Sequence, residues 1–157
     1  MKFFSIVIPV YNRPDEVSEL LQSLTQQSFK NFEVLIIEDG SSVKCDHVVQ
    51  QFSELLSIKY FFKENSGQGF TRNFGFEKAT GEFMIVFDSD CIIPEGYMQR
   101  VNDFLVKHPE VDAFGGPDSA HPDFNSLQKA ISYSMTSLFT TGGIRGRRKH
   151  VGDFPPR

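Results

Sequence analysis

The sequence predicts an α/β domain, a three-layer α/β/α sandwich built around a mostly parallel central sheet. Short, continuous apolar runs rich in β-branched residues recur between Phe4 and Phe87, which is typical of strands buried on both faces. The segments between these runs have apolar residues at helical spacing. Strand and helix therefore alternate, and this order favours parallel strands joined by right-handed crossovers, with helices on both faces of the sheet.

The expected strands are four apolar runs and one shorter segment. The first two are Phe4–Val10 (FSIVIPV) and Phe32–Ile37 (FEVLII). Ile58–Phe62 and Phe83–Phe87 have the same character, and Val111–Phe114 predicts a further short strand.

The expected helices lie between and after these strands. Pro14–Gln27 and Pro94–Lys107 both begin with proline, which is favoured in a first helical turn. Other segments with helical spacing are Cys45–Leu56, Gly69–Ala79 and Phe124–Thr141, and from Gly142 onward the sequence shows neither period.

Composition predicts one globular domain over residues 1–157. The chain is 39% hydrophobic with 17 Phe and only 23% charged residues, which argues against disorder. Its net charge of −4 gives no general footprint for nucleic acid. No stretch approaches the roughly 20 apolar residues of a membrane helix, so we expect no transmembrane segment. Cys45 and Cys91 lack disulfide or metal spacing, which favours a cytoplasmic protein whose membrane association, if any, is peripheral to the inner face.

Polar residues follow each of the four apolar runs. In open parallel sheets the ligand crevice lies beyond the carboxyl ends of the strands. The residues at these ends are Pro9, Tyr11 and Asn12, then Glu38, Asp39 and Gly40, then Asn65 and Gly67, and finally Asp88 and Asp90. We therefore expect them to meet at one edge of the sheet and form a ligand site.

Asp88 and Asp90 are candidate metal ligands. Two carboxylates on a tight turn give hard oxygen ligands and leave coordination positions for phosphate and water, which suits Mg²⁺ or Mn²⁺. Such an ion would neutralise charge on a leaving diphosphate. The structural alternative is that Asp88 starts a turn and Asp90 caps the helix after Pro94. The position directly after a buried strand favours the metal site.

Three further residues suggest a nucleotide. Asp39 can accept a hydrogen bond from the N3–H of a uracil-type base, and Tyr11 can stack on that base or contact ribose. Arg72 follows a Gly-Gln-Gly helix start and is available to phosphates, although a surface ion pair is the alternative. The chain has neither the GxGxxG of a dinucleotide site nor the GK[ST] of a P-loop.

A family resemblance is carried by FSIVIPVYNRPDEVSELLQSLTQQSFKNFEVLIIEDGSS and ENSGQGFTRNFGFEKATGEFMIVFDSDCIIP. These segments resemble the inverting family 2 glycosyltransferases, which have the GT-A fold, closely over Phe4–Pro94 and less closely to Lys107. The resemblance implies a nucleoside-diphosphate sugar donor, a UDP-sugar, with Mn²⁺ or Mg²⁺ as cofactor and a glycan or lipid-linked acceptor. It implies nucleotide contacts from Pro9, Tyr11, Asn12, Glu38, Asp39, Arg72 and Asp88, with Asp90 as the main metal ligand and Asp88 near ribose or metal.

The resemblance also has departures. Glu38 stands where the family commonly has Asp, and Cys91 stands where a third Asp is frequent. The family's general base, often in a Gly-Glu-Asp-like element before a helix, is not matched, because Asp153 is followed by Phe-Pro-Pro. We therefore expect a chain truncated before its acceptor-binding half, with the base beyond Arg157 and little transfer by this part alone.

Two other functions are weighed against sugar transfer. The unmatched base motivates a non-catalytic nucleotide-binding or interaction module of the same fold, which donor hydrolysis or transfer would exclude. A sugar-1-phosphate nucleotidyltransferase shares the sheet and the metal carboxylates. It requires a Gly-rich loop with Arg and Lys after the first strand, and Tyr11–Pro14 is not such a loop.

Overall fold

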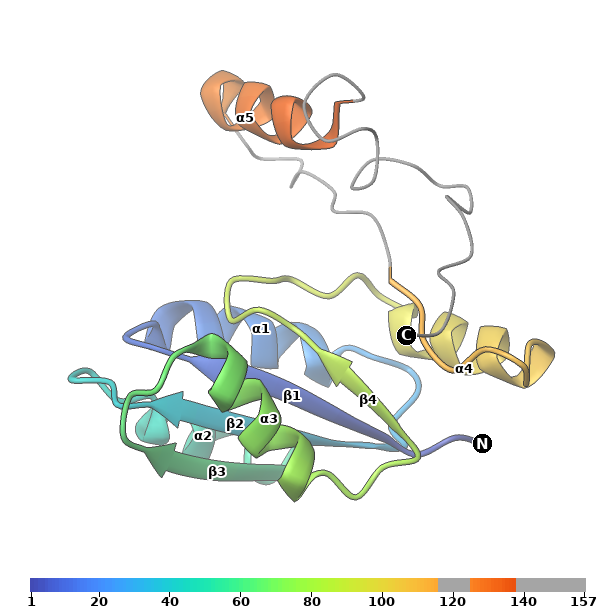
Figure 1. Cartoon of the computed structure of the whole chain (residues 1–157), viewed down its shortest axis with the longest axis horizontal. Helices are drawn as coiled ribbons and strands as arrows, with labels where there is room; N and C mark the ends of the chain where they lie inside the picture. Colours follow the sequence, from blue (N-terminus) through green and yellow to red (C-terminus); the bar gives the residue numbers. More distant parts are fainter. Residues whose placement is uncertain (116–124, 138–157) are drawn as a thin grey trace. The chain divides into compact units, whose positions relative to one another are not determined.

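Strands and helices alternate along the computed structural model as the sequence predicts (Figure 1). The structure describes residues 1–115 and 125–137, which belong to two units, Met1–Pro109 and Glu110–Arg157. The first unit contains β1 (Phe4–Val10), α1 (Pro14–Thr25), β2 (Phe32–Asp39), α2 (Asp46–Phe52), β3 (Ile58–Lys63), α3 (Gln68–Lys78), β4 (Phe83–Val86) and α4 (Tyr97–Lys107). The second contains α5 (Ser126–Thr136).

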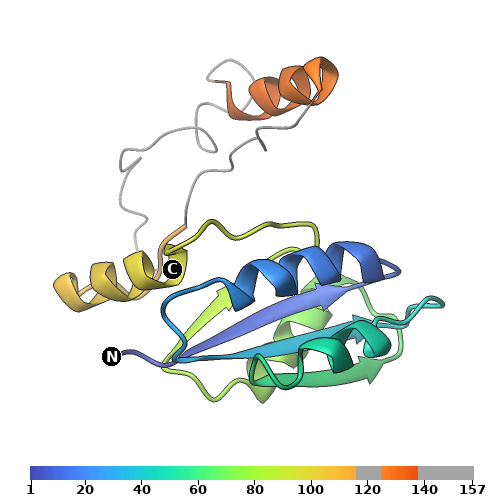
Figure 2. The same ribbon diagram turned by 180° about the vertical axis from the view of Figure 1, so that it is seen from behind.

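The sheet has the strand order β3-β2-β1-β4, and every neighbouring pair is parallel. In this register Ile6 of β1 lies between Val34 of β2 and Ile85 of β4. Helix α3 covers one face, while α1 and α2 cover the other (Figures 1 and 2). The predicted α/β fold with helices on both faces of a parallel sheet is confirmed. Parallel pairing places the carboxyl ends of all four strands at one edge.

Helix α3 packs closely on the sheet through a glycine. Val7, Leu35 and Ile37 form a fully buried cluster on this face, against which Phe74 of α3 packs. A Cβ atom added to Gly75 would lie 2.3 Å from Cγ1 of Val7 and 3.3 Å from Cγ1 of Ile37. The absence of a side chain at this position therefore sets the distance between α3 and the sheet.

We expect Gly75→Ala to lower the free energy of unfolding by about 1–3 kcal/mol, because a methyl group there overpacks the core. The matched control is Gly69→Ala in the same helix, where an added Cβ has no heavy atom within 4 Å. Urea denaturation of both variants and the unchanged chain measures the difference. Equal stability of the two variants would contradict the packing argument.

Two sequence predictions need correction. Helix α4 begins at Tyr97 rather than at Pro94, because Gly96 has a left-handed φ of 69° that a helix cannot contain. The carbonyl of Pro94 instead accepts a hydrogen bond from the backbone amide of Tyr97, at 3.1 Å, in a turn that precedes the helix. Val111–Phe114 is not a strand, since this short segment, interrupted by Asp112, has no strand partner among the described residues.

Further differences are in helix ends. Helix α2 ends at Phe52 rather than at Leu56, and the chain then turns so that the amide of Leu56 still bonds the carbonyl of Phe52, at 2.9 Å. The helix predicted over Phe124–Thr141 is observed as Ser126–Thr136, and it begins with a reciprocal capping box between Asn125 and Gln128. Phe124 and residues 138–141 lie outside the described residues.

Candidate functional site

A pocket of about 260 Å³ lies at the carboxyl edge of the sheet. It is lined by the ends of β1 and β2, the loop after β4 and the first turn of α3. The lining residues are Pro9, Val10, Tyr11, Arg13, Asp39, Gln68, Thr71, Asp88, Ser89 and Asp90. Five of the predicted site residues, Pro9, Tyr11, Asp39, Asp88 and Asp90, are thus brought together in one place.

Asp39 is the most buried acid of this pocket, with 5% of its surface exposed. One carboxylate oxygen, Oδ1, accepts Nζ of Lys63 and the amide of Ser66, and the other, Oδ2, accepts the amide of Gly67 at 2.9 Å. Burial alone would raise the pKa of Asp39, but these bonds together hold it below its usual range. Asp39 is therefore an ionised hydrogen-bond acceptor at neutral pH.

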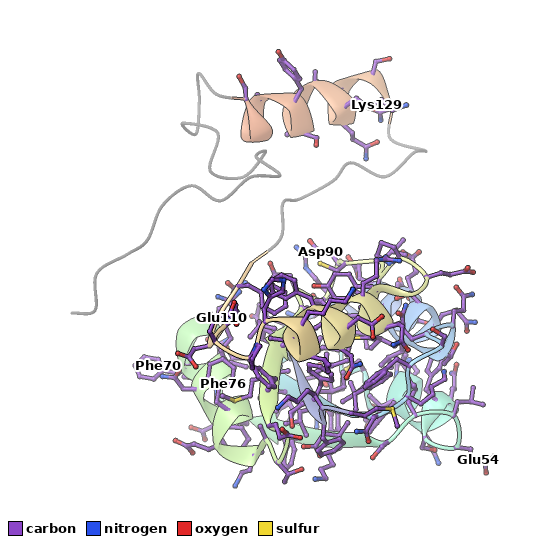
Figure 3. All side chains as sticks on the ribbon, turned by 90° about the vertical axis from the view of Figure 1, so that its right-hand side faces the viewer. Glu54, Phe70, Phe76, Asp90, Glu110 and Lys129 are labelled. Atoms are coloured by element: carbon purple, nitrogen blue, oxygen red, sulfur yellow. The ribbon has the colours of Figure 1, made fainter. Side chains whose placement is uncertain are left out.

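Each of the two acids that follow β4 pairs with an arginine. Nη2 of Arg72 lies 2.9 Å from Oδ1 of Asp88, and Nη1 of Arg13 lies 3.2 Å from Oδ2 of Asp90. Both aspartates remain more than half exposed, and Asp90 is at the surface of the first unit (Figure 3). Arg72 does not itself line the pocket, and its buried Nε has no hydrogen-bond partner within the described part of the chain. Two cationic groups thus border the pair of acids.

Arg13 lines the pocket although the sequence did not mark it as a site residue, and the same is true of Val10, Gln68, Thr71 and Ser89. It follows Tyr11 and Asn12 directly and occupies the N-cap position of α1. Its place immediately after a strand end was a usable signal, because every other strand end supplied polar residues to the same edge.

The acids after β4 have the chemistry expected of a site for a hard divalent cation. Each carboxylate gives one oxygen to an arginine, and no described residue engages the other oxygen by a hydrogen bond. The described residues contain no group of three or more His, Cys, Asp or Glu that could hold a metal. An ion bound by Asp88 and Asp90 would therefore need ligands from phosphate or water. The capping alternative for Asp90 is excluded, because Gly96 occupies the N-cap position of α4.

Glu38 and Asn12 are not brought into this pocket. Glu38 is fully buried and accepts the hydroxyl of Tyr60 and the amide of Cys45. Because β2 extends to Asp39, these consecutive acids lie on opposite faces of the strand, and only Asp39 faces the α3 side. The expected contact between Glu38 and a nucleoside is therefore corrected, since a fully buried carboxylate cannot reach a ligand.

Asn12 links the loops that follow β1 and β2. Its backbone has a φ of 55°, in the left-handed region that asparagine tolerates. Its side-chain Oδ1 accepts hydrogen bonds from the backbone amides of Ser42 and Val43, at 2.8 and 3.0 Å. Its backbone amide donates a hydrogen bond to Oγ of Ser41 at 2.8 Å. Asn12 thereby fixes the backbone next to Tyr11, which is 54% exposed at the pocket.

The buried group around Glu38 contains weakly acidic donors. Burial and the neighbouring Glu38 raise the pKa of the Cys45 thiol to about 12. The same two causes raise the pKa of the Tyr60 phenol. Both side chains consequently stay protonated at neutral pH and can donate hydrogen bonds to the Glu38 carboxylate. These bonds stabilise the carboxyl end of β2.

Helices of membrane-spanning length and apolarity do not occur in the part of the chain that the structure describes.

Comparison with known proteins identifies the class of this domain. Residues 5–156 match the family described as Glycosyl transferase family 2, and the chain belongs to that family. The poly(ribitol-phosphate) β-N-acetylglucosaminyltransferase TarS of Staphylococcus aureus strain Mu50 is 32% identical over 164 residues, covering 92% of this chain and 29% of TarS. An uncharacterized glycosyltransferase of Rickettsia felis is 32% identical over 140 residues, covering 89% of this chain and 22% of its own length.

Solved structures agree with the fold. The crystal structure of Staphylococcus aureus TarS 1–349 in complex with UDP-GlcNAc is 30% identical, with a TM-score of 0.66, covering 77% of this chain and 38% of that one. The mannosyltransferase PcManGT of Pyrobaculum calidifontis, in complex with GDP-Man and Mn²⁺, has a TM-score of 0.63 and 19% identity, covering 85% and 40%. The GT-A fold expected from the resemblance is thus confirmed, and the chain spans less than a third of these two curated relatives.

Proposed function

We propose that this chain is the donor-binding part of a metal-assisted, inverting glycosyltransferase that uses a UDP-sugar. The observation that carries the proposal is the single pocket shared by Tyr11, Asp39, Asp88 and Asp90. Solved structures of TarS in complex with UDP and with UDP-GlcNAc, each 30% identical to this chain, support a uridine nucleotide. UDP-GlcNAc is therefore the first donor to test.

Each side chain has a role that follows from its position. Tyr11 offers an exposed aromatic face at the pocket, on which a base can stack. Asp39 accepts a hydrogen bond from a ring N–H of the base. Asp88 and Asp90 would hold Mn²⁺ or Mg²⁺, which supplies Lewis-acid stabilisation of the leaving diphosphate when bound. Arg72, paired with Asp88, supplies positive charge at the same side.

The acceptor in this proposal is a glycan or a lipid-linked sugar. Inversion requires a base that takes the proton of the acceptor hydroxyl on the side opposite the departing diphosphate. We assign the role of general base to none of the described pocket residues. In this proposal Asp39 binds the nucleobase, and Asp88 and Asp90 bind the cation. Asp153, the one candidate considered from the sequence, lies outside the described residues.

The proposal is tested by titrating UDP into the chain in Mn²⁺ by isothermal calorimetry, with ADP as the comparison nucleotide. We expect saturable binding of one UDP that weakens when EDTA removes the metal, and weaker binding of ADP. Failure to bind UDP in Mn²⁺, by a chain with a cooperative thermal transition, would overturn the proposed function.

A further inference from the structure

Lys63 forms a largely buried ion pair with Asp39, an acid of the pocket. It ends β3, directly opposite Asp39 in the parallel register of β2 and β3. Only 17% of the Lys63 side chain and 7% of the Asp39 side chain are exposed. Nζ of Lys63 donates to Oδ1 of Asp39, to the carbonyl of Glu64 at 2.7 Å and to Oγ of Ser66 at 2.6 Å. The lysine therefore ties the pocket acid to the loop that leads into α3.

These bonds determine how much of Asp39 a ligand can use. A carboxylate offers about four acceptor positions. Lys63 and the amide of Ser66 fill those of Oδ1, and the amide of Gly67 takes one on Oδ2. The hydroxyl of Thr71 also contributes to lowering the pKa of Asp39, so at most one acceptor position, on Oδ2, remains for a ligand.

We propose that Lys63 is a positioning residue that sets the nucleobase preference of the pocket. It holds Asp39 as a carboxylate that can only accept hydrogen bonds and that has at most one open acceptor position. Such a group suits uracil, which presents a ring N–H donor, and opposes cytosine, which presents a ring nitrogen acceptor at the same place. This inference rests on the proposed function, because it assumes that Asp39 meets the base.

Removing Lys63 changes the acid as well as the loop. An aspartate buried without a cation favours its neutral form, which carries a hydroxyl donor besides its acceptors. That form can bond the ring nitrogen of cytosine. Loss of the lysine is therefore expected to weaken UDP binding and, in addition, to reduce the discrimination between UDP and CDP.

Lys59 is a matched control on the same strand. Its Nζ pairs with Oε2 of Glu33 at 2.8 Å, so it too is a lysine of β3 bonded to a buried acid of β2. Glu33 is the second residue of β2. It therefore lies at the amino ends of the strands, away from the pocket. A change at Lys59 tests what loss of such an ion pair does to stability alone.

The experiment measures the dissociation constants of UDP and CDP in Mn²⁺ for the unchanged chain, Lys63→Met, Lys63→Arg and Lys59→Met, together with their thermal midpoints. We expect Lys63→Met to weaken UDP binding about tenfold or more and to lower the ratio of the CDP to the UDP constant. Lys63→Arg restores part of both, and Lys59→Met lowers the midpoint but leaves both constants within about twofold. If Lys63→Met does not fold, Lys63→Gln carries the same comparison.

Distinct outcomes overturn the inference and the proposed function. Two results for a folded Lys63→Met chain overturn the role of Lys63 in base preference: an unchanged dissociation constant for UDP, or constants for UDP and CDP that change by the same factor. Neither result affects the proposed function if the unchanged chain binds UDP. An unchanged chain that binds neither nucleotide overturns the proposed function, and the role of Lys63 with it.

Discussion

Asp90→Ala is expected to weaken UDP binding in Mn²⁺ by about 100-fold, because the substitution removes one of the two acids after β4 which, among the described pocket residues, each keep an oxygen for the ion. Changes to residues that merely orient metal ligands cost about 10–100-fold in affinity, and a direct ligand should cost at least as much. In EDTA the same variant should bind UDP no worse than the unchanged chain. The reason is that Arg13 loses its partner Asp90, and its charge becomes available to a phosphate. Calorimetry in Mn²⁺ and in EDTA measures both effects.

Asp103→Ala is the control for this substitution. Asp103 is an exposed acid of α4 that bonds Gln99 and lies outside the pocket, so its removal should leave both titrations unchanged. An Asp90→Ala chain that binds UDP equally weakly with and without Mn²⁺ would show a structural effect. Unchanged affinity in Mn²⁺ would remove Asp90 from the metal site.

The positions of the pocket acids could be predicted because they depend on topology alone. Strands of a parallel sheet that are buried on both faces are continuous apolar runs, and β1 and β2 are buried at every position. The residues directly after such runs lie at one edge whatever the details of packing. Tyr11, Asp88 and Asp90 were placed in this way.

The errors arose where a single residue of register decides the outcome. The sequence predicts that the second strand ends at Ile37 and that both following acids lie in a loop, but β2 continues to Asp39. Side chains alternate along a strand, so the extension sends Glu38 to the face of Tyr60 and leaves Asp39 at the pocket. The partnership of Lys63 with Asp39 depends in the same way on the register of β2 and β3, which composition and spacing do not encode.

Glu33 is expected to contribute the largest single electrostatic term to stability. Its side chain is 3% exposed and lies on β2 near the amino ends of the strands. It accepts Oγ of Ser5 at 2.6 Å, Nζ of Lys59 at 2.8 Å, and both the hydroxyl and the amide of Thr80 at 2.7 and 2.8 Å. These bonds join β1, β2 and β3 to the turn between α3 and β4. Burial alone would raise the pKa of Glu33, but the four bonds lower it from 4.5 to about 2.

The lowered pKa fixes the direction of the pH dependence. The unfolded chain takes up a proton at Glu33 near its ordinary pKa, whereas the folded chain does so only near pH 2, so the stabilisation is complete above pH 4.5 and is lost between pH 4.5 and 2. A lowering from 4.5 to about 2 corresponds to about 3 kcal/mol. Glu33→Gln should therefore reduce the free energy of unfolding at pH 7 by about this amount.

Urea denaturation of both chains at pH 7, 4 and 2.5 tests this expectation, because the difference should shrink as the pH falls through this range. The control is Glu82→Gln, which removes an exposed carboxylate paired with Lys2 and should change stability little. If Glu33→Gln is as stable as the unchanged chain at pH 7, the charge on Glu33 does not hold the amino end of the sheet. A constant difference at all three pH values would mean that the hydrogen-bond geometry stabilises this end of the sheet and the charge does not.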